Sequence, residues 1–259
     1  MSGLKVLGVQ WDLAWESPEA NRARVERLLE GRRPEPETLV VLPEMFSTGF
    51  SMNAEGISEE PGGETERWAW DRARAWGVWL VAGWARRDAQ GVAGNEAVVV
   101  SPAGRTVATY RKRRPFSPGD EPRHYPAGGE AVVFEWRGLG VAPFICYDLR
   151  FPEVFGAVVD RRPELLTVIA SWPERRIEHW MTLLRARAIE HQAYVVGVNR
   201  TGEDPAHRYP GHSVVVDPWG EVVVDAGSVE GVIEATLDLG RLREYREKLP
   251  FLEDRRVAA

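Results

Sequence analysis

The sequence predicts an α/β protein in which two mixed β-sheets face each other and helices cover their outer sides. Short β-branched runs alternate with longer segments of helical periodicity along the 259 residues. Several of these runs are apolar at nearly every position, which is typical of strands that are buried on both faces. A hairpin pattern also occurs twice, and this repetition indicates two related halves that each contribute a sheet.

The predicted strands are short runs that are rich in Val, Ile, Leu, Thr and aromatic residues. They cover residues 4–10, 38–42, 78–84, 96–101, 106–110, 131–136, 139–145, 165–170, 194–199, 212–217, 221–225 and 231–236. Tight turns join some of them, whereas helical segments separate others. This mixture predicts sheets with both parallel and antiparallel neighbours.

Five segments have helical periodicity, at residues 18–29, 65–76, 152–160, 177–192 and 239–248. Ser17 and Pro18 are typical of an N-cap and a first helical position. The strongest pattern is in the fourth segment, where one face carries apolar residues at a spacing of three and four, namely Ile177, Trp180, Met181, Leu184 and Ala188. Three charged residues fall outside that face: Arg185, Arg187 and Glu190.

The repeated hairpin pattern comprises residues 98–107, VVVSPAGRTV, and residues 214–223, VVVDPWGEVV. Each has β-branched runs on both sides of Pro-x-Gly, where Pro presets φ for a turn and Gly accepts a positive φ. No linker or low-complexity segment separates the two halves. We therefore predict one domain over residues 1–259.

The composition predicts a globular protein that does not bind nucleic acid or a membrane. Hydrophobic residues make up 44% and charged residues 28% of the chain, and 33 Lys and Arg against 39 Asp and Glu give a formal charge of -6. A nucleic-acid-binding protein needs a surplus of basic residues. No apolar run approaches the roughly 20 residues that cross a bilayer. The first residues lead directly into a β-like run without a signal-peptide pattern, so we expect a cytoplasmic protein.

Cys146 is the single cysteine, which excludes an intramolecular disulfide. It ends the apolar run at residues 139–145 and precedes a turn and Pro152, a residue suited to the start of a helix. A thiol at such a strand-to-helix turn lies near helix N-terminal amides, which favour the nucleophilic thiolate. Taken alone, Cys146 is better interpreted as a buried structural thiol, because most single cysteines are of that kind.

Glu44 follows an apolar strand and Pro43, at the carboxyl end of a strand where α/β folds commonly bind ligands. A carboxylate at that place is suited to general acid–base catalysis. The alternative is a surface loop carboxylate. Glu121, in the loop PGDEPRHY, has the same two interpretations.

Lys112 lies in the basic run Arg111–Arg114, which could be a solvated surface patch. Side chains alternate along an extended strand, so Lys112 points away from the side that Arg111 and Arg113 occupy. An inward Lys beside a thiol would lower the pKa of the thiol and could stabilise an oxyanion.

Other catalytic patterns are missing. The segment at residues 211–215, GHSVV, lacks the closing Gly of a serine-hydrolase elbow, and no phosphate loop, GxGxxG or HExxH motif is present. His207 and His212 remain a possible pair of metal ligands.

Three motifs in order resemble those of the nitrilase, or carbon-nitrogen hydrolase, superfamily: LPEMF at residues 42–46, YRKRRPF at 110–116 and ICYDLRFPE at 145–153. The likeness extends over nearly the whole chain, through ARAIEHQAYVVGVNRTG at 186–202 to EYREKLPF at 244–251. Within the superfamily, the motifs look most like those of the omega-amidase (2-oxoglutaramate amidase) branch.

This resemblance implies a four-layer α-β-β-α sandwich, a homodimer that associates through outer helices, and no metal or organic cofactor. It places the catalytic triad on Glu44, Lys112 and Cys146, with Glu121 as an auxiliary carboxylate. The implied function is a cysteine-dependent amidase that acts through a thioester on a small amide with a carboxylate group, of the 2-oxoglutaramate or 2-oxosuccinamate type.

Four residues near these motifs are candidates for substrate binding, namely Phe116, Tyr147, Arg150 and Trp172. The backbone N–H of Tyr147 is placed to hold an oxyanion together with Lys112. Arg150 is suited to a bidentate contact with a substrate carboxylate, and its alternative role is an ion pair with Asp148 or Glu153. Phe46 and Tyr125 are further aromatic candidates for the pocket, although aromatic residues are more often core.

Rival interpretations remain open. The substrate could be deaminated glutathione, an N-carbamoyl amino acid, a nitrile or a short aliphatic amide. A catalytically silent binding protein of the same fold is a different class of function, and a metal hydrolase based on His207 and His212 is a third.

Overall fold

The computed structural model describes residues 3–255, and its strands form two six-stranded sheets and one two-stranded ribbon. In the order of its strands, the first sheet contains β14 (Gly231–Leu237), β1 (Leu4–Gln10), β2 (Leu39–Val41), β3 (Trp79–Arg87), β4 (Ala93–Ser101) and β5 (Arg105–Arg111). The second contains β13 (Val222–Asp225), β12 (Val214–Val216), β9 (Tyr194–Val198), β8 (Leu165–Ile169), β7 (Leu139–Ile145) and β6 (Phe134–Trp136). The ribbon pairs β10 (Thr201–Glu203) with β11 (Arg208–Pro210).

The two large sheets have matching topologies. Strands β1, β2 and β3 are parallel, as are β7, β8 and β9, and an antiparallel hairpin follows the third strand of each set. These hairpins are β4–β5 beside β3 and β12–β13 beside β9. They are the two segments with the Pro-x-Gly pattern, so the prediction of two related halves with one sheet each is confirmed.

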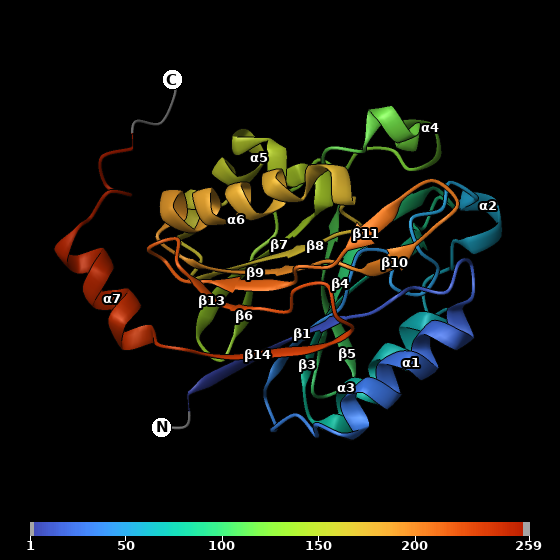
Figure 1. Cartoon of the computed structure of the whole chain (residues 1–259), viewed down its shortest axis with the longest axis horizontal. Helices are drawn as coiled ribbons and strands as arrows, with labels where there is room; N and C mark the ends of the chain where they lie inside the picture. Colours follow the sequence, from blue (N-terminus) through green and yellow to red (C-terminus); the bar gives the residue numbers. More distant parts are fainter. Residues whose placement is uncertain (1–2, 256–259) are drawn as a thin grey trace.

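Helices cover the outer sides of both sheets (Figure 1). Helices α1 (Pro18–Glu30) and α3 (Glu64–Trp76) lie on the first sheet, and α5 (Pro152–Gly156) and α6 (Ile177–His191) lie on the second. Helix α7 (Leu239–Lys248) follows β14 at one end of the molecule. The predicted four-layer α-β-β-α sandwich is therefore confirmed.

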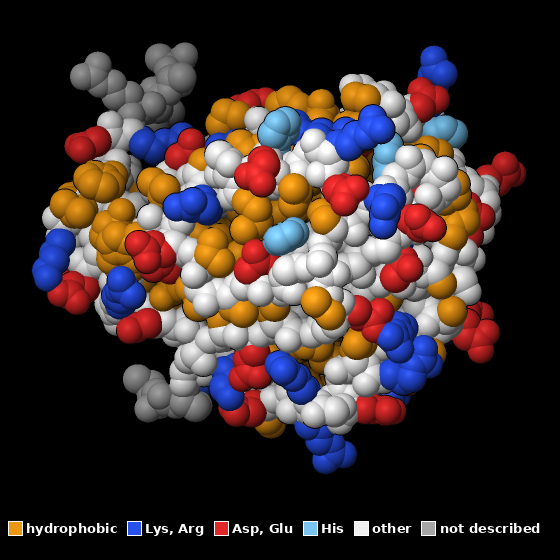
Figure 2. All heavy atoms as spheres, in the orientation of Figure 1, with side chains coloured by type: hydrophobic (Ala, Val, Ile, Leu, Met, Phe, Trp, Pro, Cys, Tyr) orange, Lys and Arg blue, Asp and Glu red, His pale blue; other side chains and the backbone are white. Residues whose placement is uncertain are grey.

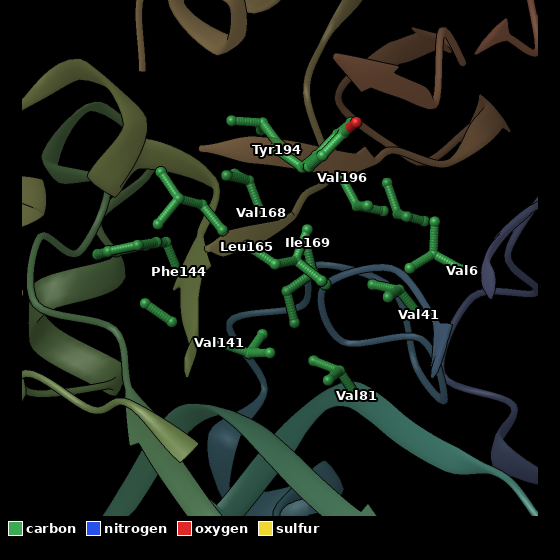
Figure 3. Packing of buried hydrophobic residues seen from close by; sticks show 14 of the residues in the cluster. Val6, Val41, Val81, Val141, Phe144, Leu165, Val168, Ile169, Tyr194 and Val196 are labelled. Atoms are coloured by element: carbon green, nitrogen blue, oxygen red, sulfur yellow. The ribbon is translucent and has the colours of Figure 1, made fainter. Parts of the chain in front are cut away.

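Alternation along the strands of the first sheet divides its side chains between two cores. Val6, Val41 and Val81 point toward the second sheet, where Figure 3 shows them opposite Val141 and Ile169. On each strand, the residue next to this valine in sequence points to the helices instead and packs with side chains of α1 and α3. These residues are Leu7, Val40 and Leu80. Both large sheets thus share one apolar core, and burial on two faces explains their continuous apolar runs.

Several predicted boundaries are wrong. Only residues 134–136 of the predicted strand 131–136 pair with β7, and the predicted helix 152–160 ends at Gly156 and is followed by the 3-10 turn η3 (Val159–Arg161). Ser17 occupies the N-cap position of α1, but its side chain makes no capping hydrogen bond. The ribbon β10–β11 and the short helices α2 (Ala54–Ile57) and α4 (Glu121–His124) were not predicted.

Arg187, which the helical pattern places off the apolar face, is not exposed to solvent. Its side chain is buried, donates to the carbonyl of Leu149 at 2.9 Å and lies over the ring of Phe155. The guanidinium of Arg187 therefore connects α6 to the turn after β7. A long Arg side chain can be buried in this way because its stem packs among apolar residues.

Charged side chains of both signs are interspersed on the face shown in Figure 2. No helix within residues 3–255 is both long enough and apolar enough to cross a lipid bilayer.

Candidate active site

Strand ends bring the candidate catalytic residues to one edge of the sandwich. Glu44 lies shortly after β2, and Lys112 directly follows β5. Strand β3 is parallel to β2, β4 is antiparallel to β3, and β5 is antiparallel to β4. Strand β5 therefore runs in the same direction as β2. Cys146 directly follows β7 of the opposite sheet. The backbone N–H of Ser171, just after β8, donates to Oε2 of Glu44 at 2.8 Å and joins the two sheets at this edge.

Lys112 forms the centre of a buried ion-pair network. Its Nζ lies 2.8 Å from Oε1 of Glu44 and 2.8 Å from Oε2 of Glu121. The side chain of Lys112 is 1% exposed and those of both carboxylates are 0% exposed. The surface interpretations of Glu44, Lys112 and Glu121 are therefore excluded by their burial.

Asn95 on β4 completes this network. Its Nδ2 donates to Oε1 of Glu44 and to Oε1 of Glu121, both at 2.8 Å. The N–H of Phe116 adds a bond of 2.5 Å to Oε2 of Glu121. Each carboxylate is thus held by several donors, which satisfies buried charges that would otherwise be costly.

Cys146 begins the 3-10 turn η2 (Cys146–Arg150) with a positive φ of 47°. This left-handed conformation is uncommon for a residue other than Gly, and it is often found at functional sites. The Sγ atom lies 3.9 Å from the carbonyl oxygen of Ser171. The turn after β7 therefore starts at the cysteine itself, six residues before the Pro152 from which the sequence predicts a helix.

Asp148 stabilises this turn through three hydrogen bonds. It accepts hydrogen bonds from Tyr110 Oη at 2.7 Å, from the N–H of Ile145 at 3.1 Å and from the N–H of Arg114 at 2.8 Å. Burial raises the pKa of Asp148 to about 6, although its bond from Tyr110 and the charge of Lys112 oppose that shift. These bonds connect the segment after β5 with the segment after β7.

The pKa of the Cys146 thiol is shifted in opposite directions by its surroundings. Burial raises it above the ordinary value, the nearby charge of Glu44 raises it further, and the charge of Lys112 lowers it, as expected from the sequence. For Lys112, burial lowers the pKa, but the charges of Glu121 and Glu44 raise it above its ordinary value, so the ammonium is retained.

A cleft with about 370 Å³ of empty space opens above Cys146. All four predicted substrate-binding residues line it: Phe116, Tyr147, Arg150 and Trp172. The other lining residues are Phe50, Ser171, Pro173, Arg176, His207 and Tyr209. The cleft wall is therefore largely aromatic, with two guanidinium groups.

Arg150 does not form the predicted alternative ion pair. Its Nη1 and Nη2 both lie 3.2 Å from Nδ1 of His179, which must accept because a guanidinium has only donors. The guanidinium also lies 4.8 Å from the ring centre of Trp172. Asp148 is bonded elsewhere, and Glu153 pairs with Arg114.

The further aromatic candidates lie outside the cleft. Phe46 is buried among Trp11, Trp68 and Trp84, and Tyr125 is buried and donates to the carbonyl of Ser51. Both are core residues.

The two histidines proposed as metal ligands have different surroundings. His212 Nδ1 lies 3.0 Å from Oδ2 of Asp225, whereas His207 lines the cleft. No group of three or more potential metal-ligating side chains occurs between residues 3 and 255.

Sequence reasoning missed Asn95, the Ser171 N–H, Phe50, Arg176 and Tyr209. Asn95 lies inside β4, but the predicted strand begins at residue 96, so its polarity gave no signal in the sequence. The position of Tyr209 depends on the ribbon β10–β11, which has no clear sequence pattern.

Comparisons with known proteins agree with this geometry. The family model of the carbon-nitrogen hydrolases matches residues 6–247. The chain is 41% identical over 259 residues to the omega-amidase YafV of Yersinia enterocolitica, with 98% of this chain and 97% of that protein covered. It is 34% identical over 247 residues to the 2-oxoglutaramate amidase of Bacillus subtilis (strain 168), with 95% of each covered.

Among solved structures, XC1258 from Xanthomonas campestris is similar over 100% of this chain and 99% of its own, with a TM-score of 0.92 and 34% identity. That protein is described as a CN-hydrolase superfamily protein with an arsenic adduct in its active site. The sandwich, the residues at its edge and these similarities agree: the chain belongs to the carbon-nitrogen hydrolase family and is a hydrolase of carbon–nitrogen bonds.

Proposed function

We propose that this chain is a cysteine-dependent amidase that hydrolyses the terminal amide of a small substrate with a carboxylate group, of the 2-oxoglutaramate or 2-oxosuccinamate type. The observation that supports the chemistry is the buried carboxylate of Glu44, which is bonded to Lys112 and to the backbone N–H of Ser171, while the carbonyl oxygen of Ser171 lies 3.9 Å from Sγ of Cys146. The relatives named omega-amidase and 2-oxoglutaramate amidase support the substrate class.

In the first step, Sγ of Cys146 attacks the amide carbon while Glu44 accepts the thiol proton. Burial and Glu44 raise the pKa of this thiol, which favours transfer of its proton to a general base as the bond to carbon forms. The carbonyl oxygen becomes an oxyanion, which Lys112 and the backbone N–H of Tyr147 stabilise.

Collapse of this tetrahedral intermediate breaks the carbon–nitrogen bond. Glu44 returns its proton to the leaving nitrogen, and ammonia departs from a thioester on Cys146. Glu44 then accepts a proton from water, whose oxygen adds to the thioester carbon. The carbon–sulfur bond breaks, the acid product leaves, and Glu44 reprotonates the thiolate.

Glu121 has a positioning role in this scheme. Its contact with Nζ of Lys112, together with the contact of Glu44, holds the ammonium in position. Arg150, in the cleft wall, binds the carboxylate at the far end of the substrate.

An ammonia-release panel tests the proposal. Purified protein should release ammonia from 2-oxoglutaramate or 2-oxosuccinamate faster than from N-carbamoyl amino acids, nitriles or deaminated glutathione. Cys146→Ala should abolish this release while circular dichroism and the thermal transition stay unchanged. Full activity of that variant would refute the nucleophile, and a faster reaction with another substrate class would replace the proposed one.

Arg150→Lys should weaken hydrolysis of carboxylate-bearing amides far more than hydrolysis of neutral amides, because Lys cannot make a bidentate contact. Equal losses on both would remove Arg150 from substrate recognition.

We also propose a single domain, a homodimer and a cytoplasmic location. The shared core between the two sheets supports the single domain, and the family resemblance supports the other two. Light scattering after size-exclusion chromatography tests the dimer.

A further inference from the structure

Arg176 is a guanidinium in the cleft wall without a protein anion as a partner. It lies in the 3-10 turn η4 (Glu174–Arg176), immediately before α6, and its guanidinium carbon is 5.5 Å from the ring centre of Phe116. Within residues 3–255, its side chain forms no hydrogen bond and has no carboxylate oxygen within 4.0 Å. Only the backbone of Arg176 forms hydrogen bonds in the described part of the chain, and its carbonyl oxygen accepts one from Trp172 Nε1 at 2.7 Å.

Arg150 lines the same cleft, and it also has no carboxylate partner among the residues that the structure describes. Burial lowers the pKa of Arg150, and the charge of Arg176 lowers it further, which shows that the two cations repel each other. Two guanidinium groups that share a cleft and form no ion pair with a carboxylate of residues 3–255 are stabilised by an anion placed between them.

The buried residues beside Cys146 have the reverse net charge. Two carboxylates, Glu44 and Glu121, contact one ammonium, Lys112. An anionic group is therefore repelled from Cys146 and attracted to the arginines. A neutral amide at the thiol with a carboxylate at the other end is the substrate arrangement that this charge distribution favours.

We propose that Arg176 is a specificity-determining residue that binds the substrate carboxylate jointly with Arg150. This proposal rests on the proposed function and extends it, because it assigns carboxylate recognition to two cations from different turns, one after β7 and one before α6. The pair fixes the orientation of the substrate as well as its charge.

Matched substrates test this role. Glutaramate ends in a carboxylate, and pentanamide has the same chain length and amide but ends in a methyl group. Arg176→Gln should lower kcat/KM for glutaramate about ten- to a hundredfold, through KM, because a charge-assisted contact is lost. Its kcat/KM for pentanamide should change less than about threefold. Arg175→Gln is the control, because Arg175 is exposed and does not line the cleft.

Binding measurements provide a second readout that does not depend on turnover. In a Cys146→Ala background, calorimetry should show that Arg176→Gln weakens glutaramate binding by a similar factor and Arg175→Gln does not. The double variant Arg150→Gln, Arg176→Gln should lose less than the product of the two single effects, because both residues bind one group.

The outcomes separate this proposal from the proposed function. If Arg176→Gln lowers kcat/KM for both substrates equally, or leaves the affinity for glutaramate unchanged, the role of Arg176 is refuted. The amidase proposal still stands in either case. If the unmodified enzyme hydrolyses pentanamide with the same kcat/KM as glutaramate, the proposed substrate class itself fails.

Discussion

Nζ of Lys112 lies 2.8 Å from Oε1 of Glu44, and neither side chain has more than 1% of its surface exposed. The two residues come from segments that are 68 positions apart in the sequence. Their contact compensates two buried charges at once, since loss of either partner would leave the other uncompensated in an environment of low polarity.

Replacement of Lys112 by Met should therefore destabilise the protein strongly. The variant leaves Glu44 and Glu121 without their cation, and the free energy of unfolding should fall by about 3–5 kcal/mol, measured by urea denaturation. Lys5→Met is the control, because Lys5 pairs with Glu35 and Glu234 in a partly exposed position, where loss should cost about 1 kcal/mol or less. Similar losses in both variants would contradict the importance assigned to the buried network.

Asn95 should influence turnover more than substrate binding, because it contacts both carboxylates and does not line the cleft. Asn95→Ala should lower kcat about tenfold or more with a small change in KM, since a misplaced base slows proton transfer. Asn95→Asp should be more damaging, because it adds a third carboxylate to the network. Steady-state measurement of kcat and KM for both variants tests this prediction. Asn53→Ala, which removes the N-cap of α2, should leave kcat unchanged.

The reactivity of Cys146 should reveal the opposing effects of its two charged neighbours. Burial is the largest cause of its raised pKa, Glu44 adds to the shift, and Lys112 opposes it. At a fixed neutral pH, Glu44→Gln should therefore increase the thiolate fraction and the rate of alkylation by iodoacetamide. Lys112→Met should decrease both.

Alkylation of the unmodified protein should also accelerate as the pH rises, with a midpoint above that of the unfolded chain, whose thiol titrates near about 8.5. The chain has one cysteine, so mass spectrometry follows a single site. A midpoint at or below the unfolded value would show that the resting enzyme already holds a thiolate.

Gly83 on β3 should tolerate no side chain. A Cβ there would lie 2.7 Å from Ile169 Cδ1, 2.9 Å from the backbone N of Met45 and 3.0 Å from Cα of Glu44. Gly83→Ala should thus displace the turn that contains Glu44, lowering activity as well as the melting temperature. Gly31→Ala is the matched control, because no atom lies within 4 Å of its added Cβ. Unchanged activity in Gly83→Ala would show that this turn can move without consequence.

Most strands and the long helices were predictable from the sequence, since burial on two faces leaves continuous apolar runs and burial on one helix face leaves a spacing of three and four. Boundaries were less predictable. Residues 131–133 do not pair although β7 continues to Ile145, far enough to meet them. The short ribbon β10–β11 depends on packing beside the cleft rather than on local preference.

Arg187 shows why periodicity alone can mislead. The helical pattern places it off the apolar face of α6, yet its guanidinium bonds to Leu149 and packs on Phe155. The burial of this side chain is determined by the turn after β7, which lies on that side of the helix, and no local pattern in α6 reports that neighbour.

By itself, the sequence determined the layered fold, the family motifs and the positions of Glu44, Lys112 and Cys146 at strand ends, because these follow from local periodicity and short motifs. Only the tertiary structure decided the burial that raises the pKa of Cys146, the bridging role of Asn95 and the location of Arg176 in the cleft. Each of these depends on distances between segments far apart in the chain, and charge interactions and desolvation vary with those distances rather than with sequence order.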